Sequence, residues 1–169
     1  MPEKEKPGLG PLAGKDPRVL ILGSFPSVIS LEKGEYYANK RNLFWRIIES
    51  LFDIDPELPY DQRIASLFER GIALWDVVSE CSREGSSDSK IKDVIPNDIP
   101  GFLRENPTIK CIALNGIGGA GKWFKKIHGD LPGHPDVTVL VLKSTSPANA
   151  GYTFEEKLSE WKKILEYTR

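Results

Sequence analysis

The segment NGIGGAGKW at residues 115–123 has the glycine spacing of two phosphate-binding motifs. Gly116, Gly118 and Gly121 have the G-x-G-x-x-G spacing of a dinucleotide-binding turn. Together with Lys122 the segment also contains most of a P-loop, in which glycine amides and a lysine hold nucleotide phosphates. A nucleotide cofactor is therefore the first chemistry to consider.

Both motifs are incomplete. A P-loop needs Ser or Thr after the lysine to hold Mg²⁺, and here that position is Trp123. A dinucleotide-binding turn follows the first strand of its unit and needs an acidic residue about 20 residues further on. This turn follows a later strand, and the segment VTVLVLK at 137–143 contains no acid. We expect no nucleotide cofactor and interpret the glycines as a tight strand-to-helix turn, built either for packing alone or as part of the floor beneath a flat ligand.

A long loop after the first predicted strand, residues 24–41, is a second candidate for chemistry. Loops of this length are usually functional or disordered. Aromatic side chains interleaved with amides and cations suit stacking on a nucleic-acid base while the cations hold phosphates. The alternative is local structure, in which Asn39 or Asn42 caps the following helix and Phe44 belongs to the core. The residues that carry this pattern are Tyr36, Tyr37, Asn39, Lys40, Arg41, Asn42, Phe44 and Trp45.

The segment STSPANAGYT at 144–153 is a third candidate, because small residues let backbone amides approach a phosphate and hydroxyls donate to its oxygens. The alternative is a polar turn before a capped helix. The spacing leaves open whether the apolar tip near Ala148 inserts into a base stack. The residues expected to contact DNA in this loop are Ser144, Thr145, Ser146, Pro147, Ala148 and Asn149.

Four continuous apolar runs, at 18–23, 72–78, 109–115 and 137–142, predict strands of a parallel sheet that is covered on both faces. Helical periodicity between them predicts a three-layer α/β/α sandwich with a central four-stranded parallel sheet. In such sheets ligands bind beyond the carboxyl ends of the strands. The loops expected to form the site are therefore 24–41, 79–92, 115–121 and 143–152.

The periodic segments predict helices at 42–52, 61–70, about 98–105, and 121–127. A further helix is marked by a capping box between Thr153 and Glu156. Its expected apolar face consists of Phe154, Leu158, Trp161 and Leu165.

At 169 residues the chain is long enough for one domain, which we place at 17–169 after a charged, Pro- and Gly-rich leader at 1–16 that we expect to be flexible. Its net charge of −1 favours no particular partner, so a nucleic-acid site would have to be a local patch. The two isolated cysteines and the two histidines predict neither a disulfide framework nor a metal site. No signal peptide or membrane span is evident, and we expect a monomer in the cytoplasm.

The order of the segments LGSFPS, YYANKRNLFW, ALWDVV, IALNG and STSPAN resembles the uracil-DNA glycosylase superfamily. Within it, the chain is most similar to the hypoxanthine-DNA (deoxyinosine) glycosylase branch, and the resemblance extends from about residue 18 to the end. It implies a parallel α/β/α fold, extrusion of a deaminated base from DNA and hydrolysis of its N-glycosidic bond without cofactor or metal. The product is an abasic site for base excision repair.

The resemblance also implies roles for individual residues. In better-known branches an Asp or Asn of the first loop positions the attacking water; here Phe25 stands there, and the branch resemblance assigns catalysis to Asn39. The last motif of the uracil enzymes begins with a histidine, which here is Ser144, so the cation that stabilises a uracil leaving group is absent. Lys40 stands where many relatives have proline.

An extruded base would stack on Phe44, as aromatic platforms do. The other residues implied at the base pocket are Gly23, Ser24, Phe25 and Asn115, and the cations implied at phosphates are Lys40 and Arg41.

Alternatives remain open from the sequence. They are a uracil- or mismatch-specific glycosylase on the same fold, a non-catalytic module that binds damaged DNA, and a nucleotide-dependent enzyme that uses the glycine cluster.

Overall fold

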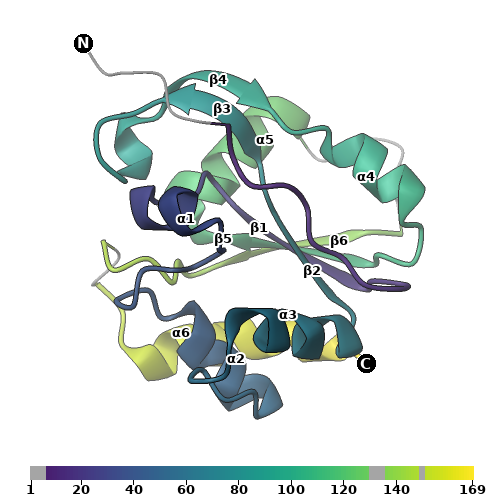
Figure 1. Cartoon of the computed structure of the whole chain (residues 1–169). Coiled ribbons are helices and arrows are strands. Elements are labelled where there is room, and N and C mark those ends of the chain that lie inside the picture. Colours follow the sequence, from purple (N-terminus) through teal and green to yellow (C-terminus); the bar gives the residue numbers. More distant parts are fainter. Residues whose placement is uncertain (1–6, 130–135, 149–150) are drawn as a thin grey trace.

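The computed structural model describes residues 7–129, 136–148 and 151–169. Its centre is a four-stranded parallel sheet in the order β2-β1-β5-β6, as the four apolar runs predict (Figure 1). The strands are β1 (Val19–Gly23), β2 (Ile72–Asp76), β5 (Cys111–Asn115) and β6 (Thr138–Leu142). All four therefore end at the same edge of the sheet.

The sheet separates two hydrophobic cores, and β1 contributes to both. Val19 and Ile21 belong to one core, whereas Leu20 and Leu22 belong to the other. Successive strand side chains point to opposite faces, so a strand covered on both sides needs apolar residues at every position. This is why the run VLILG is apolar throughout.

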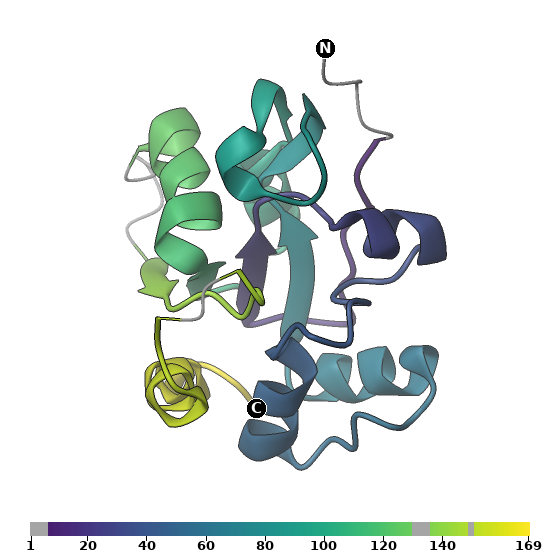
Figure 2. The ribbon, with the colours of Figure 1, turned by 90° about the vertical axis from the view of Figure 1, so that its left-hand side faces the viewer.

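Helices cover both faces of the sheet, which confirms the predicted three-layer architecture (Figures 1 and 2). Residues of α2, α3 and α6 form one core with the sheet, and residues of α4 and α5 form the other. The bounds of these helices are Phe44–Phe52 (α2), Tyr60–Glu69 (α3), Ile99–Glu105 (α4), Lys122–His128 (α5) and Phe154–Trp161 (α6).

The last helix begins as predicted but ends differently. Thr153 and Glu156 form both hydrogen bonds of the capping box. After Trp161 the chain tightens into a 3₁₀ helix, Lys162–Glu166, with three residues per turn. Ile164 is consequently buried, whereas Leu165 is 41% exposed, so the predicted place of Leu165 on the apolar face is wrong.

The prediction of a flexible leader at 1–16 is wrong for the part that the structure describes, residues 7–16. Leu12 and Leu74 exchange two backbone hydrogen bonds of 2.9 Å, and Gly8 donates to the carbonyl of Ser79. This segment therefore lies antiparallel along the outer edge of β2. Covering an edge strand satisfies backbone groups that would otherwise be open to other chains.

One α-helix and two strands among the described residues were not predicted. The first-loop segment contains α1 (Val28–Lys33), and the expected loop 79–92 begins with β3 (Val78–Ser82), which pairs with β4 (Lys92–Pro96) in an antiparallel hairpin. The run KDVIP of β4 is mostly exposed, so it lacks the apolar alternation from which strands are predicted. Within the described ranges no helix is long and apolar enough to cross a membrane.

Candidate functional site

The loops that follow β1, β5 and β6, the end of β2 and the connection between β3 and β4 enclose a cavity of about 120 Å³ at the carboxyl edge of the sheet. An engineered cavity of about 150 Å³ binds benzene, so this space is of the scale of a flat ring. Residues from all four predicted loops line it, and the largest share comes from the first loop. This cavity at the carboxyl edge of the sheet is therefore the candidate functional site.

Tyr36 anchors the first loop to the rest of the molecule. Its hydroxyl donates to the carbonyls of Leu9 and Gly10, at 3.2 and 2.7 Å, and its backbone N–H donates to the hydroxyl of Tyr60 at 3.0 Å. The Tyr36 side chain is only 3% exposed. Tyr36 thus acts as a fixed point of the loop rather than as a ligand-binding group.

Tyr37 presents its ring to the cavity in a strained backbone conformation. Its φ of 55° lies in the left-handed region, which is an outlier for a bulky residue and is typical of functional sites. The Tyr37 ring stacks on Phe44 with centroids 3.9 Å apart and an interplanar angle of 20°. Its hydroxyl accepts a hydrogen bond of 3.3 Å from Asn115 Nδ2.

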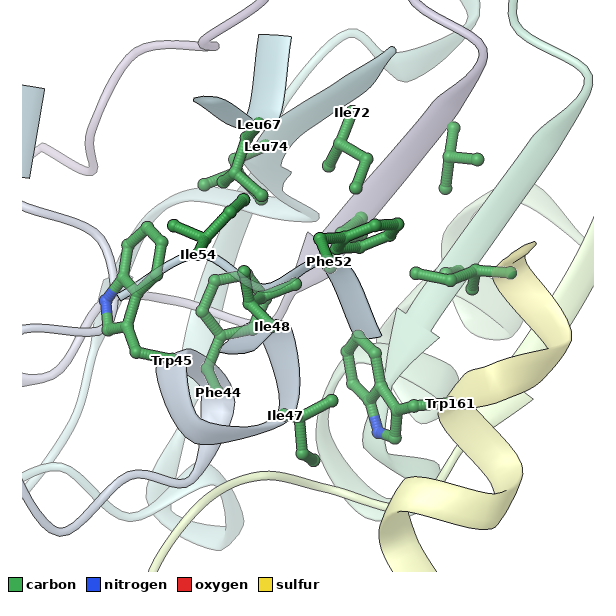
Figure 3. Packing of buried hydrophobic residues seen from close by; sticks show 14 of the residues in the cluster. Phe44, Trp45, Ile47, Ile48, Phe52, Ile54, Leu67, Ile72, Leu74 and Trp161 are labelled. Carbon is green, nitrogen blue, oxygen red and sulfur yellow. The ribbon is translucent and has the colours of Figure 1, made fainter. Parts of the chain in front are cut away.

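The structure places Phe44 in the core, which corrects its prediction as a base platform. Phe44 is fully buried, packs edge-on against Trp45 and Trp161, and does not line the cavity (Figure 3). The reason is its place at the start of α2, where the apolar stripe of the helix faces the sheet. Tyr37 stands between Phe44 and the cavity and takes the exposed face of the stack.

Asn115 and Thr145 join the ends of β5 and β6. Asn115 Nδ2 donates to Thr145 Oγ1, and the Thr145 N–H donates to Asn115 Oδ1, each at 2.9 Å. The carbonyl of Thr145 also accepts from the N–H of Leu43, which ties this loop to the first loop. Thr145 is fully buried, so the prediction that its hydroxyl contacts a DNA phosphate is wrong. Asn115 lines the cavity, and its amide is held in place by these hydrogen bonds.

The two asparagines of the first loop have different local roles. Asn42 Oδ1 accepts from the N–H of Phe44, the first residue of α2, although the N-cap residue of this helix is Leu43. Asn39 is half-buried in the cavity lining, and its Oδ1 accepts from the N–H of Arg41 at 3.0 Å. The alternative in which Asn39 caps the following helix is wrong, because α2 begins only at Phe44. Lys40 and Arg41 are both exposed beside it.

Two carboxyl groups, of Asp76 and Asp88, also line the cavity. Asp88 accepts a hydrogen bond of 2.5 Å from the hydroxyl of Ser24. Asp76 is 4% exposed, and its Oδ2 has no hydrogen-bond partner among the described residues. Burial, reinforced by the charge of Asp88, raises the pKa of Asp76 to about 7, and burial also raises the pKa of Asp88.

Asp76 is the functional candidate that the sequence pattern missed. It ends the apolar run IALWD, and an acid at the carboxyl end of a parallel strand was the available signal. Gly23 makes room for it, because a Cβ at Gly23 would lie 2.5 Å from Asp76 Oδ1. Phe25, predicted for the base pocket, lines the cavity and lies under the guanidinium of Arg83.

The glycine cluster forms a short π-helix, Gly116–Gly121, between β5 and α5 rather than the predicted tight turn. Gly116 has a φ of 106°, which favours glycine, and a Cβ at Gly119 would collide with the carboxyl group of Asp88. The π-helix therefore backs Asp88 and lines an adjoining groove rather than the cavity itself. Trp123, after the lysine, is buried in the core beneath α5.

The loop after β6 contributes Ser144, Ser146 and Pro147 to the cavity, and Ala148 is exposed at its tip. Asn149, also predicted to contact DNA, lies outside the described residues. Lys143 begins the loop and is held by an ion pair with Glu160 of α6, which raises the pKa of the lysine.

Comparison with known proteins gives consistent similarities over almost the whole chain. The family model of the uracil DNA glycosylase superfamily matches residues 11–169. A hypoxanthine DNA glycosylase of Methanosarcina acetivorans is 33% identical over 163 residues, which covers 96% of this chain and 99% of that protein. A hypoxanthine DNA glycosylase of Methanosarcina barkeri is 35% identical over 113 residues, covering 66% of this chain and 72% of that protein.

A solved structure has the same fold. The solution NMR structure of a Methanosarcina acetivorans protein, provisionally assigned as a uracil DNA glycosylase, superposes with a TM-score of 0.80 at 32% identity. The match covers 96% of this chain and 97% of that one.

Proposed function

Because the chain belongs to the uracil DNA glycosylase superfamily, we propose that it is a DNA glycosylase that releases hypoxanthine from DNA and leaves an abasic site. The names of the two similar hypoxanthine DNA glycosylases from Methanosarcina support the choice of base. DNA that contains a deaminated base is then its substrate, and the cavity at the carboxyl edge of the sheet receives the base after extrusion from the helix.

The observation that carries the assignment of the site is the position of Asn39. It lines the cavity, and two exposed cations, Lys40 and Arg41, follow it in the chain. No titration is needed for an amide oxygen to align a water molecule, so the group works through geometry alone. Its hydrogen bond from the N–H of Arg41 holds the amide in one orientation.

Asn39 acts on the water that attacks C1′ of the deoxyribose. As the N-glycosidic bond lengthens, positive charge develops on the sugar and negative charge on the departing base. The DNA phosphates stabilise the sugar cation, and the aligned water adds to it as the base leaves. The water loses its proton to solvent, and the product is an abasic site.

The remaining lining residues hold the base. Gly23, Ser24 and Phe25 form one wall, and the ring of Tyr37 supplies the aromatic face that was predicted for Phe44. Asn115 holds Tyr37 in position by donating a hydrogen bond to the Tyr37 hydroxyl. Lys40 and Arg41, with Ser144 and Ser146 across the cavity, contact the phosphates. The protein acts as a monomer without nucleotide cofactor or metal.

The test is single-turnover base release from oligonucleotides that contain 2′-deoxyinosine, 2′-deoxyuridine or 2′-deoxyxanthosine. We expect release of hypoxanthine by the wild-type protein and a loss of roughly 10²-fold or more in Asn39→Ala with DNA binding retained. Asn42→Ala is the matched control, because it removes only the hydrogen bond to the N–H of Phe44 at the start of α2, costs about 1 kcal/mol of stability and leaves release within a few-fold.

Each other outcome would replace part of the proposal. Release of uracil alone would indicate a uracil enzyme, and binding without release would indicate a damage-binding module. Release of hypoxanthine by Asn39→Ala within a few-fold of wild type would mean that another group holds the water.

A further inference from the structure

The side chain of Asp76 has a burial and an environment that folding alone does not explain. It is 96% buried at the end of β2, and its Oδ2 has no hydrogen-bond partner among the described residues. A buried polar atom without a partner costs about 1–3 kcal/mol of stability. Asp76 lines the cavity, so the group that the carboxyl can bind is a ligand in that cavity.

The neighbours of Asp76 determine which of the two pocket carboxyls holds a proton. Asp88 accepts from Ser24, which favours its charged form, and its negative charge acts on Asp76. Arg83 opposes this effect from the same side. The hydroxyls of Tyr36 and Tyr37, on the first loop, stay neutral because burial raises the pKa of both.

A pair of carboxyls whose environments separate their pKa values is a typical acid and base arrangement. Asp88 is the member that stays ionised, since it has a hydroxyl donor and is the less buried of the two. Asp76 is the member that keeps its proton near neutral pH, with a pKa of about 7. A carboxyl that is neutral at this pH can donate a hydrogen bond or a proton to a ligand.

A departing purine needs such a donor. When the C1′–N9 bond breaks, its electron pair moves onto the base, and protonation at N7 lets hypoxanthine leave as a neutral molecule. Ser144, at the start of the loop after β6, carries no positive charge that could stabilise an anionic base instead. Among the described residues that line the cavity there is no lysine, arginine or histidine.

We propose that Asp76 is the general acid of the reaction and donates its proton to N7 of the extruded purine as the glycosidic bond breaks. The inference rests on the proposed function. The Asp76 proton passes to the base, the attacking water loses its own proton to solvent, and Asp76 regains a proton from solvent after the base departs. The acid thus matches the pocket to purines, because a uracil leaving group has no N7.

The test is the pH dependence of single-turnover release from 2′-deoxyinosine DNA between pH 6 and pH 9, for wild type and Asp76→Asn. The wild-type rate should fall about tenfold per pH unit above pH 7, because only the protonated acid acts. Asp76→Asn should be independent of pH and roughly 10²-fold slower at pH 6, so that the two rates converge near pH 9. Binding of both proteins to the DNA should be similar.

Two further variants separate an acid from a structural residue. Asp88→Asn removes the negative charge that raises the pKa of Asp76. The release rate of this variant should therefore begin to fall at a lower pH than that of wild type. Asp61→Asn, at an exposed position in the first turn of α3, is the matched control and should leave the profile unchanged.

The outcomes distinguish this inference from the proposed function. Hypoxanthine release by Asp76→Asn at the wild-type rate, or with the same falling limb, overturns the role of Asp76 alone. If the release rate of Asp88→Asn begins to fall at the same pH as that of wild type, this result also contradicts the role of Asp76. A wild-type protein that releases no hypoxanthine overturns the proposed function and this inference with it.

Discussion

Two groups of residues around the cavity differ in how their polar atoms are satisfied. In the first, which we call the framework side, Tyr37 stacks on Phe44, and Asn115 is bonded to Tyr37 and to Thr145. In the second, which we call the acidic side, the carboxyl groups of Asp76 and Asp88 both line the cavity, and one carboxyl oxygen of Asp76 has no partner in the described chain.

The difference separates two uses of buried polar groups. Groups that bond to one another fix the position of a wall, and the free energy lost on removing them is a loss of stability. A buried carboxyl without a partner lowers stability in the free protein and becomes useful when a ligand completes it. Substitutions on the framework side should therefore affect folding first, and substitutions on the acidic side should affect chemistry first.

The largest effect is expected for Phe44→Ala on the framework side. The ring is fully buried between the sheet, α2 and α6, so its removal should lower the free energy of unfolding by about 3–5 kcal/mol. Base release should follow the folded fraction. Chemical denaturation and release assays on the same samples test this. Unchanged stability with a large loss of release would place Phe44 against the base after all and would break the comparison.

Asn115→Ala should lower the free energy of unfolding by about 2–3 kcal/mol, because it leaves the buried N–H and hydroxyl of Thr145 without partners. Chemical denaturation measures the loss. Asn42→Ala, which removes only one hydrogen bond at the start of α2, should cost about 1 kcal/mol. Equal losses in the two variants would mean that the bonds between Asn115 and Thr145 contribute no more than this single bond.

Asp76→Asn should change the pH dependence of stability. The raised pKa of Asp76 means that the folded protein holds a proton that the unfolded chain has lost, so wild-type stability falls as pH rises from about 4 through 7. The variant lacks this slope. The stability of Asp76→Asn relative to wild type should increase by roughly 1–3 kcal/mol between pH 5 and pH 8. Parallel pH curves from chemical denaturation would contradict the raised pKa.

The smallest effect on stability is expected for Lys40 and Arg41, the exposed cations of the first loop. Lys40→Ala combined with Arg41→Ala should change stability by less than about 0.5 kcal/mol. If each cation neutralises one phosphate, the slope of log affinity against log salt should decrease by about 1.8. The exposed pair Arg104→Ala and Lys110→Ala, beside the amino end of β5, is the control and should leave the slope unchanged. An unchanged slope in the first variant would mean that this loop faces away from DNA.

Most of the framework was predictable because its signals are local. The run VLILG is apolar throughout because both faces of β1 are covered, and the capping box of Thr153 and Glu156 needs only three residues of separation. Asn39 lines the cavity, and its catalytic role stays a prediction. The hairpin of β3 and β4 was missed, since its mostly exposed second strand has no apolar pattern.

The sequence by itself determined the parallel sheet, the order of the layers and the edge at which four loops meet. Only the tertiary structure decided that Tyr37, not Phe44, faces the cavity, that residues 7–16 line β2, and that Asp76 shares its pocket with Asp88. The physical reason is range. Strand and helix periodicities arise between neighbours in the chain, whereas the burial of a carboxyl and the charge beside it depend on segments that only the folded chain brings together.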